Sequence, residues 1–177
     1  DSAMTELYAS TLQAIGMQSI LLNEISRSIL FSRKLASTTG ESNIFIKSSL
    51  LKQSVIVWCQ VFGSRGENLH WSNVVSKQRF VAPFNRKKIL DSTGFSEKEW
   101  SSYHETLKHL RDKFFAHFDM NEFSAKMPCM DKALVITEIY RDWLYSMLLE
   151  ASKTNLIHIN FEKSVDFNNR VESEWKP

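Results

Sequence analysis

The sequence predicts an all-α fold, a bundle of four to five helices, and three observations support this prediction. Apolar residues recur at three- to five-residue steps over long stretches, which is the spacing of a helix face. Glycine and proline are scarce, with 5 and 3 among 177 residues, which argues against a loop-rich β fold and a disordered chain. A helix-start signal precedes the clearest apolar stripe. We expect one helical domain over residues 4–155, followed by a tail over 156–177 whose structure the pattern leaves open.

The first half of the chain contains two long predicted helices. The apolar spacing from Thr5 to Leu35 predicts one helix, or two helices that join near Gly16. Residues 37–40 have the composition of a stop and a turn, and a second helix is expected from about Ser42 to Val61. Its middle, residues 54–58, is mostly β-branched, but the helical flanks favour a helix over a strand.

The second half begins with shorter predicted elements. Residues 62–68 have the composition of a loop, and a short helix is expected from Trp71 to Phe80. Pro83 ends that helix or bends it, and residues 91–94 form the next expected turn. After the central helix described next, a last long helix is expected from about Asp131 to Ala151.

The central helix of the second half has a start signal and a clear apolar stripe. Ser96 and Glu99 form a capping box, in which the serine hydroxyl accepts from the amide three residues on and the glutamate reaches back. Apolar and aromatic residues then follow steps of three, four, three, four and three, which predicts one inward face. They are Trp100, Tyr103, Leu107, Leu110, Phe114 and His117.

Composition and motifs exclude several classes of function. A net charge of +2 is too small to imply nucleic-acid binding by bulk attraction. Two cysteines, Cys59 and Cys129, cannot form a four-cysteine zinc site or a disulfide framework, so a reduced setting is the simpler interpretation. No apolar segment approaches the roughly 20 residues that cross a bilayer, and no secretory signal is visible. We expect a cytoplasmic protein without membrane contact.

Cofactor and metal sites are not expected either. The phosphate-binding and dinucleotide-binding glycine motifs are missing, so nucleotide chemistry of those two kinds has no support. No His-Glu-x-x-His pair occurs, and His104 and His109 lie five residues apart on different sides of one helix. The sequence therefore predicts no metal and no cofactor.

Residues 110–119 carry the most informative chemistry. Arg111 and His117 lie about 120° apart around the helix axis and about 9 Å apart along it, so they are not a tight pair on one strip. They can still meet at the mouth of a groove, or across a two-fold axis. Histidine moves protons near neutral pH and arginine neutralises phosphate charge, which suits phosphodiester cleavage. The alternative is a core histidine hydrogen-bonded to backbone or to a carboxylate.

The Arg-x5-His string resembles the signature of HEPN domains, in which a polar residue follows the arginine and a small residue precedes the histidine. Here Asp112 is the polar residue, and the string from Leu110 to Asp119 looks most like the abortive-infection (AbiU-like) branch. Residues 58–63 and His70-Trp71 are similar to the middle region of that branch. The resemblance covers roughly Ile44 to Ala151 and implies a HEPN-like helical bundle.

The resemblance also implies a function. HEPN proteins are commonly metal-independent endoribonucleases, or inactive relatives, that dimerise so that two motifs form one groove. By carry-over His117 is the general acid/base, Arg111 stabilises the phosphate, and Asp112 orients the histidine or the partner's arginine. Asp119 is a supporting residue of open role. It stands where HEPN toxins paired with nucleotidyltransferase antitoxins often have tyrosine, so that form of control is not supported.

A basic stretch between Asn68 and Leu90 holds no acidic residue and interleaves aromatic with cationic side chains. Such a pattern follows a phosphate backbone and stacks on unpaired bases, although a charge run is more often a solvated face. The predicted RNA-binding residues are Lys77, Arg79, Arg86, Lys87, Lys88 and, on the motif helix, Lys113. The interleaved aromatics are Trp71, Phe80 and Phe84.

Two functions of different class follow. The first is an RNA-cleaving or RNA-binding HEPN protein in phage defence or a toxin–antitoxin-like system, acting as a homodimer on RNA or with an antitoxin or other partner protein. The alternative is a non-catalytic helical module that dimerises or binds a partner. A ligand box at Trp58, His70 and Trp71 is a weaker interpretation than an aromatic anchor under the loop, with Cys59 buried beside it.

Overall fold

The computed structural model describes residues 2–35, 37, 39–116, 127–153 and 160–175, which form helices and connecting loops without a strand. The side chains of residues 2–8 and 114–116 are outside this description. The helices are α1 (Ser2–Lys34), α2 (Glu41–Phe62), α3 (Ser72–Val75), α4 (Arg86–Thr93), α5 (Glu97–Ala116), α7 (Asp131–Ser152) and α8 (Ser164–Glu174). The prediction of an all-α fold is confirmed for this part of the chain.

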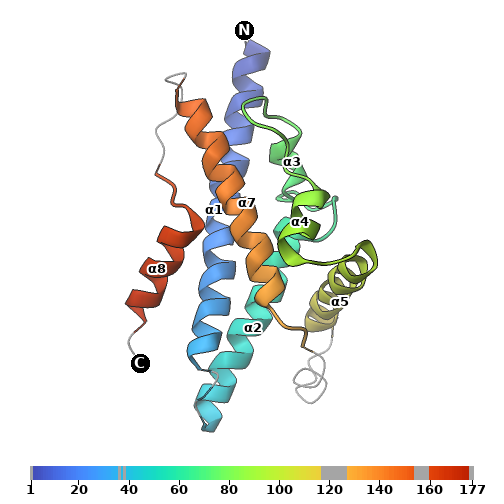
Figure 1. Ribbon diagram of the computed structural model, residues 1–177, viewed down its shortest axis with the longest axis vertical. Helices are drawn as coiled ribbons and strands as arrows, with labels where there is room; N and C mark the ends of the chain where they lie inside the picture. Colours follow the sequence, from blue (N-terminus) through green and yellow to red (C-terminus); the bar gives the residue numbers. More distant parts are fainter. Residues whose placement is uncertain (1, 36, 38, 117–126, 154–159, 176–177) are drawn as a thin grey trace.

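Helices α1 and α2 pack along each other, and α7 lies against α1 (Figure 1). α8 packs on α1 and α7 at one flank of this layer, while α5 packs on α2 at the opposite flank. The shared core is almost entirely apolar, and each of its large side chains stabilises the fold by about 1.5–3 kcal/mol through burial. Its fully buried members include Leu22, Ile25, Ile29, Trp58, Phe62, Leu107, Ile136, Tyr140 and Leu144.

The two long N-terminal helices agree with the periodicity. α1 runs unbroken through Gly16, so the single-helix alternative is the one that forms. The β-branched middle of α2 is helical, and Val55, Val57 and Trp58 there are buried. α2 ends at Gly63, whose amide donates to the carbonyl oxygen of Cys59 at 2.9 Å. A Cβ at Gly63 would lie 2.3 Å from that oxygen, so the approach requires glycine.

Two short elements differ from the prediction. The helix expected from Trp71 to Phe80 is limited to α3, because the buried side chain of Gln78 replaces helical hydrogen bonds. Its amide oxygen accepts from the Phe80 and Val81 amides at 2.8 and 3.1 Å, and its nitrogen donates to the Val81 carbonyl at 2.9 Å. The chain therefore turns away from the helix before Pro83.

The turn expected over residues 91–94 is in fact mostly helical, because the chain leaves the helix only at Gly94. Residues 86–93 form α4, whose first turn is capped by the Asn85 side chain accepting from the Lys88 amide at 3.1 Å. Gly94 ends the helix with φ 72°, a left-handed conformation that glycine adopts without a steric cost. Packing of the buried Ile89 on the α7 side supports this basic, short helix, which periodicity alone did not indicate.

The capping box of α5 is confirmed. The Glu99 amide donates to the Ser96 hydroxyl at 3.2 Å, and the Glu99 carboxylate accepts from the Ser96 amide at 2.8 Å. Trp100, Leu107 and Leu110 of the stripe are buried, as predicted. The stripe's last two members, Phe114 and His117, lie outside the described side chains.

The C-terminal region forms two helices on the common core. α7 matches the predicted last long helix to within one residue at its end. Part of the tail left open by the sequence forms α8, which buries Phe167 and Val171 against α1 and α7. The described chain thus has seven helices instead of four to five, because α4 and α8, which are too short to show clear periodicity, add to the predicted ones. None of these helices combines the length and apolarity that crossing a bilayer requires.

Candidate functional site

Arg111, the predicted phosphate stabiliser, lies on α5 where that helix faces the loop after α2. Its Nη1 donates to the Glu67 carboxylate at 2.9 Å, and its Nε donates to the Asp112 carboxylate at 2.9 Å. The Arg111 side chain is 17% exposed, against 38% for Glu67 and 65% for Asp112. Two N–H donors of the guanidinium, at Nη1 and Nε, are therefore occupied by carboxylates at the protein surface.

The two carboxylates keep Arg111 charged. Burial by itself lowers the pKa of Arg111, but the Asp112 hydrogen bond and the negative charges of Asp112 and Glu67 raise it above its ordinary value. The arginine is a permanent cation whose orientation is set by hydrogen bonds from two directions. A ligand anion that approaches Nη1 has to displace the Glu67 carboxylate from this cation.

His104, about two helical turns before Arg111 on α5, also contacts the start of the loop after α2. Its Nε2 donates to the carbonyl oxygens of Phe62 and Gly63, at 2.7 and 3.0 Å. These carbonyls lie at the C-terminal end of α2, where the helix itself offers them no hydrogen-bond donor. The His104 ring packs against Trp58 and Trp100, with centroids 6.1 and 4.9 Å away. Burial lowers the pKa of His104, so the ring serves as a neutral donor.

The far end of this loop is held by a second buried histidine. The Ser72 amide donates to His70 Nδ1 at 3.2 Å, and the Ser72 hydroxyl lies 2.7 Å from the same nitrogen. Burial, helped by the positive charge of Arg65, lowers the pKa of His70 to about 4. His70 is a neutral structural residue, which favours the interpretation of an aromatic anchor with Trp71 over a ligand box.

Cys59 lies in the core beneath Arg111 and takes no part in surface chemistry. It is fully buried, and burial raises the pKa of its thiol to about 12. Cys129, the other cysteine, is exposed. The expectation that Cys59 is buried beside Trp58 is confirmed, and its thiol is unsuited to act as a nucleophile.

The structure brings only part of the predicted catalytic set together. Arg111 and Asp112 are hydrogen-bonded neighbours, and Lys113 is half-buried on the following position of α5. His117 and Asp119 lie outside the residues that the structure describes. The described residues therefore include the Arg111–Asp112 part of the predicted motif and not its histidine.

Arg86, one of the predicted basic residues, lies at the end of α5 opposite to Arg111. Arg86 pairs with Glu97 in the first turn of α5 at 2.9 Å, and Arg111 follows 14 residues later, about 21 Å along the helix axis. Lys87 pairs with Asp91 on α4 itself, which is typical of a solvated helix face. The other cations of the stretch, Lys77, Arg79 and Lys88, are also exposed.

The aromatic residues of this stretch are unequally accessible. Phe84 is 2% exposed and packs against Tyr140 and Trp143 in the core, so it cannot stack on a base. Trp71 is half-buried against Phe84, and Phe80 is 39% exposed. The expected pattern of alternating cations and stacking rings is thus reduced to Phe80 and the edge of Trp71.

Sequence reasoning missed Glu67 and His104 as site residues. Glu67 stands 44 positions before Arg111, in a loop of ordinary turn composition, so no spacing rule connects the two. His104 was considered only as a metal ligand, and no group of three His, Cys, Asp or Glu side chains suited to a metal occurs in the described ranges. Both residues are recognised as site residues only once the contacts between the loop after α2 and α5 are known.

Comparisons of the chain with protein-family models, with curated proteins and with solved structures give no match. The interpretation of this site therefore rests on its own residues and geometry.

Proposed function

We propose that this protein binds and cleaves RNA without a metal ion, as a HEPN-like protein in which Arg111 and His117 are the reacting pair. The observation that supports this most is the arginine itself, a permanently charged, hydrogen-bonded guanidinium at the surface, six residues before the histidine. A setting in phage defence or a toxin–antitoxin-like system rests on the resemblance of residues 110–119 alone.

The chemistry follows from these groups. The attacking atom is the substrate's own 2′-hydroxyl, which displaces the 5′-oxygen of the next nucleotide. His117 takes or returns the proton, and Arg111 stabilises the charge that develops on the phosphate oxygens. Because Glu67 occupies Arg111 Nη1, an incoming phosphate competes with that carboxylate. A second copy of the chain across a two-fold axis supplies the second pair of side chains in this proposal.

A non-catalytic helical module is the second candidate, and a specific observation favours it. Arg111 is already satisfied by Glu67 and Asp112 within the same chain. In this alternative the arginine only clamps the loop after α2 onto α5, and the exposed face of the bundle binds a second copy or a partner protein.

The deciding experiment incubates the pure protein with mixed RNAs in EDTA and compares the wild type with His117→Ala. The matched control is His109→Ala, which removes an exposed histidine of α5. Loss of an acid/base group typically lowers a rate by about a hundred- to ten-thousand-fold, so we expect only His117→Ala to lose cleavage. Products should end in a 2′,3′-cyclic phosphate, and DNA of the same sequence should stay intact.

The outcomes separate the two candidates. Equal cleavage by the wild type and His117→Ala removes the histidine from the mechanism. A wild type that neither cleaves nor binds RNA supports the non-catalytic module. Light scattering tests the dimer independently, because a mass of 20.6 kDa at tens of micromolar corresponds to a single chain.

A further inference from the structure

A second arginine cluster lies on the opposite flank of the bundle, around the ring of Phe167 on α8. The guanidinium carbons of Arg141, Arg170 and Arg27 lie 4.1, 5.2 and 5.3 Å from the centroid of that ring. Glu162 and Glu174 hydrogen-bond Arg170. Neither Arg27 nor Arg141 forms an ion pair with any carboxylate of the described chain.

Arg141 is the unusual member of this cluster, because it is 1% exposed. Its Nη2 donates to the side-chain oxygen of Asn23 at 2.7 Å, and its guanidinium otherwise contacts the rings of Phe161 and Phe167. Buried charges in proteins are normally paired with a counter-charge. Aromatic faces, one neutral amide and the more distant negative charges of Glu162 and Asp142, neither of which forms an ion pair with Arg141, compensate only part of the desolvation of this cation.

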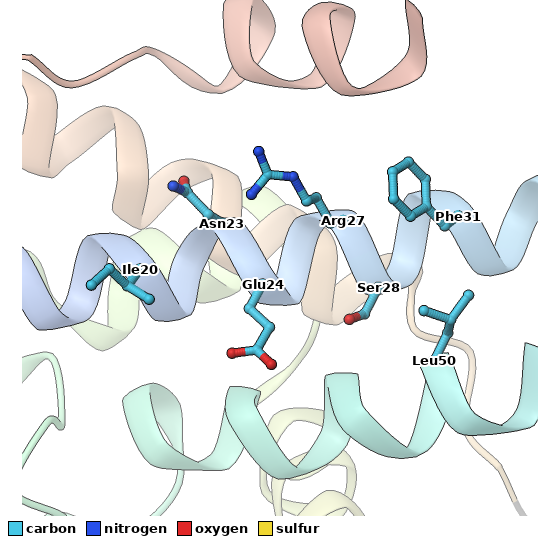
Figure 2. A pocket seen from close by; sticks show the side chains of 7 residues that line it. All are labelled: Ile20, Asn23, Glu24, Arg27, Ser28, Phe31 and Leu50. Carbon is cyan, nitrogen blue, oxygen red and sulfur yellow. The ribbon is translucent and has the colours of Figure 1, made fainter. Parts of the chain in front are cut away.

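Asn23, which accepts from Arg141, also lines a groove of about 550 Å³ formed by residues of α1 and by Leu50 of α2. Figure 2 shows Asn23 and Arg27 pointing to the same side, toward α8, while Glu24 and Ser28 point toward α2. The Glu24 carboxylate already accepts from the Gln53 amide at the far edge of the groove. The full lining is Ile20, Asn23, Glu24, Arg27, Ser28, Phe31 and Leu50.

The groove thus combines a cation, Arg27, on the α8 side, the Glu24 carboxylate on the α2 side, and apolar side chains. Because the Asn23 oxygen accepts from Arg141, the amide nitrogen of Asn23 is left as a donor on the same side of α1 as Arg27. Ile20, Phe31 and Leu50 provide apolar surface next to these donors. The volume lies in the range of small-molecule sites, about 300–1,000 Å³.

We propose that this groove binds a small phosphorylated molecule. Arg27 and the Asn23 amide hold the phosphate group, Arg141 behind Asn23 supplies the buried positive charge, and the organic part lies over Ile20, Phe31 and Leu50. This site is separate from Arg111 and does not depend on RNA cleavage.

The test measures the thermal stability of the full chain in inorganic phosphate against sodium chloride of equal ionic strength. We expect phosphate to raise the melting temperature of the wild type in a saturable way. Arg27→Gln should lower the affinity for phosphate at least about tenfold, since a charged hydrogen bond is removed. Arg33→Gln is the matched control, because Arg33 lies exposed on the same helix and pairs with Asp131 instead.

A second variant keeps the shape of the site while changing its charge. Asn23→Asp places a carboxylate on Arg141, so the protein should become more stable in chloride and lose its response to phosphate. Adenosine monophosphate should bind several-fold more tightly than inorganic phosphate if its base uses the apolar side chains of the groove. Equal phosphate responses of the wild type, Arg27→Gln and Asn23→Asp would overturn the proposal, and equal affinity for the two probes would remove the apolar part of it.

Discussion

Arg111 and Arg141 lie on opposite flanks of one bundle and have opposite kinds of partners. Arg111 is partly exposed and bonds two carboxylates, whereas Arg141 is buried and contacts an amide and two aromatic rings. The deeper charge therefore has no carboxylate of the described chain at ion-pair distance, and Glu162 and Asp142 act on it only from farther away. Burial raises the cost of an unpaired charge, so the difference indicates where an external anion gains most.

The same difference sets what each arginine must give up to bind a ligand. A phosphate at Arg111 exchanges with Glu67, so part of its binding free energy is spent on breaking an existing ion pair. A phosphate at Arg27 and Asn23 displaces no carboxylate of the described chain. Small anions should accordingly favour the flank of α8, while the Arg111 side needs a polyanion with further contacts.

The largest expected effect on stability comes from removing the ring that supports Arg141. Phe167→Ala should lower the free energy of unfolding by about 3–5 kcal/mol, because it opens a cavity and uncovers a buried cation. Chemical denaturation measures it, with Phe80→Ala as the control, since Phe80 is 39% exposed. A loss below about 1 kcal/mol for Phe167→Ala would mean that the ring does not support Arg141.

Lowering the pH should reduce the stability of the flank that contains Arg111, while the charge of Arg141 on the other flank stays the same. The pKa of His70 falls from 6.5 to about 4 on folding, so its stabilisation is complete above pH 6.5 and is lost as the pH falls toward 4. The shift corresponds to about 3 kcal/mol at most. The pKa of Arg141 is lowered only to about 10, mainly by burial, so its charge is unchanged in this window.

Denaturation of the wild type and of His70→Asn at pH 7.5 and 5.0 measures this difference. The asparagine variant should be less stable than the wild type at pH 7.5 and should lose much less stability on acidification. The same slope in both proteins would show that His70 is not the group responsible.

The smallest expected effect concerns the ion pair of Glu67 with Arg111. A double-mutant cycle with Glu67→Ala and Arg111→Ala should give a coupling of about 0.5–1 kcal/mol, because Glu67 is partly exposed. Labelling of the buried Cys59 in a Cys129→Ser background should become about two- to fivefold faster in Glu67→Ala. The control Arg170→Ala, on the other flank, should leave the Cys59 rate unchanged.

The sequence predicted the parts of the fold that depend on near neighbours along the chain. The apolar spacing identified α1, α2, α5 and α7, and the Ser96–Glu99 capping box forms as expected. Both signals act within one or two helical turns, so they do not need the rest of the molecule. The basic helix α4 and the C-terminal helix α8 escaped notice because packing on α7, rather than their own pattern, supports them.

The candidate sites show the same distinction between features that are local in the sequence and contacts between distant residues. The string around Arg111 was visible because its residues are close in sequence, but its partner Glu67 is 44 positions away. The contact of Asn23 with Arg141 spans 118 positions, and nothing in the local sequence marks Arg141 as buried. The sequence by itself determined the helices and the position of Arg111 on one of them. Tertiary packing decided the long-range partners, Glu67 for Arg111 and Asn23 for Arg141, because only the folded chain brings these distant segments together.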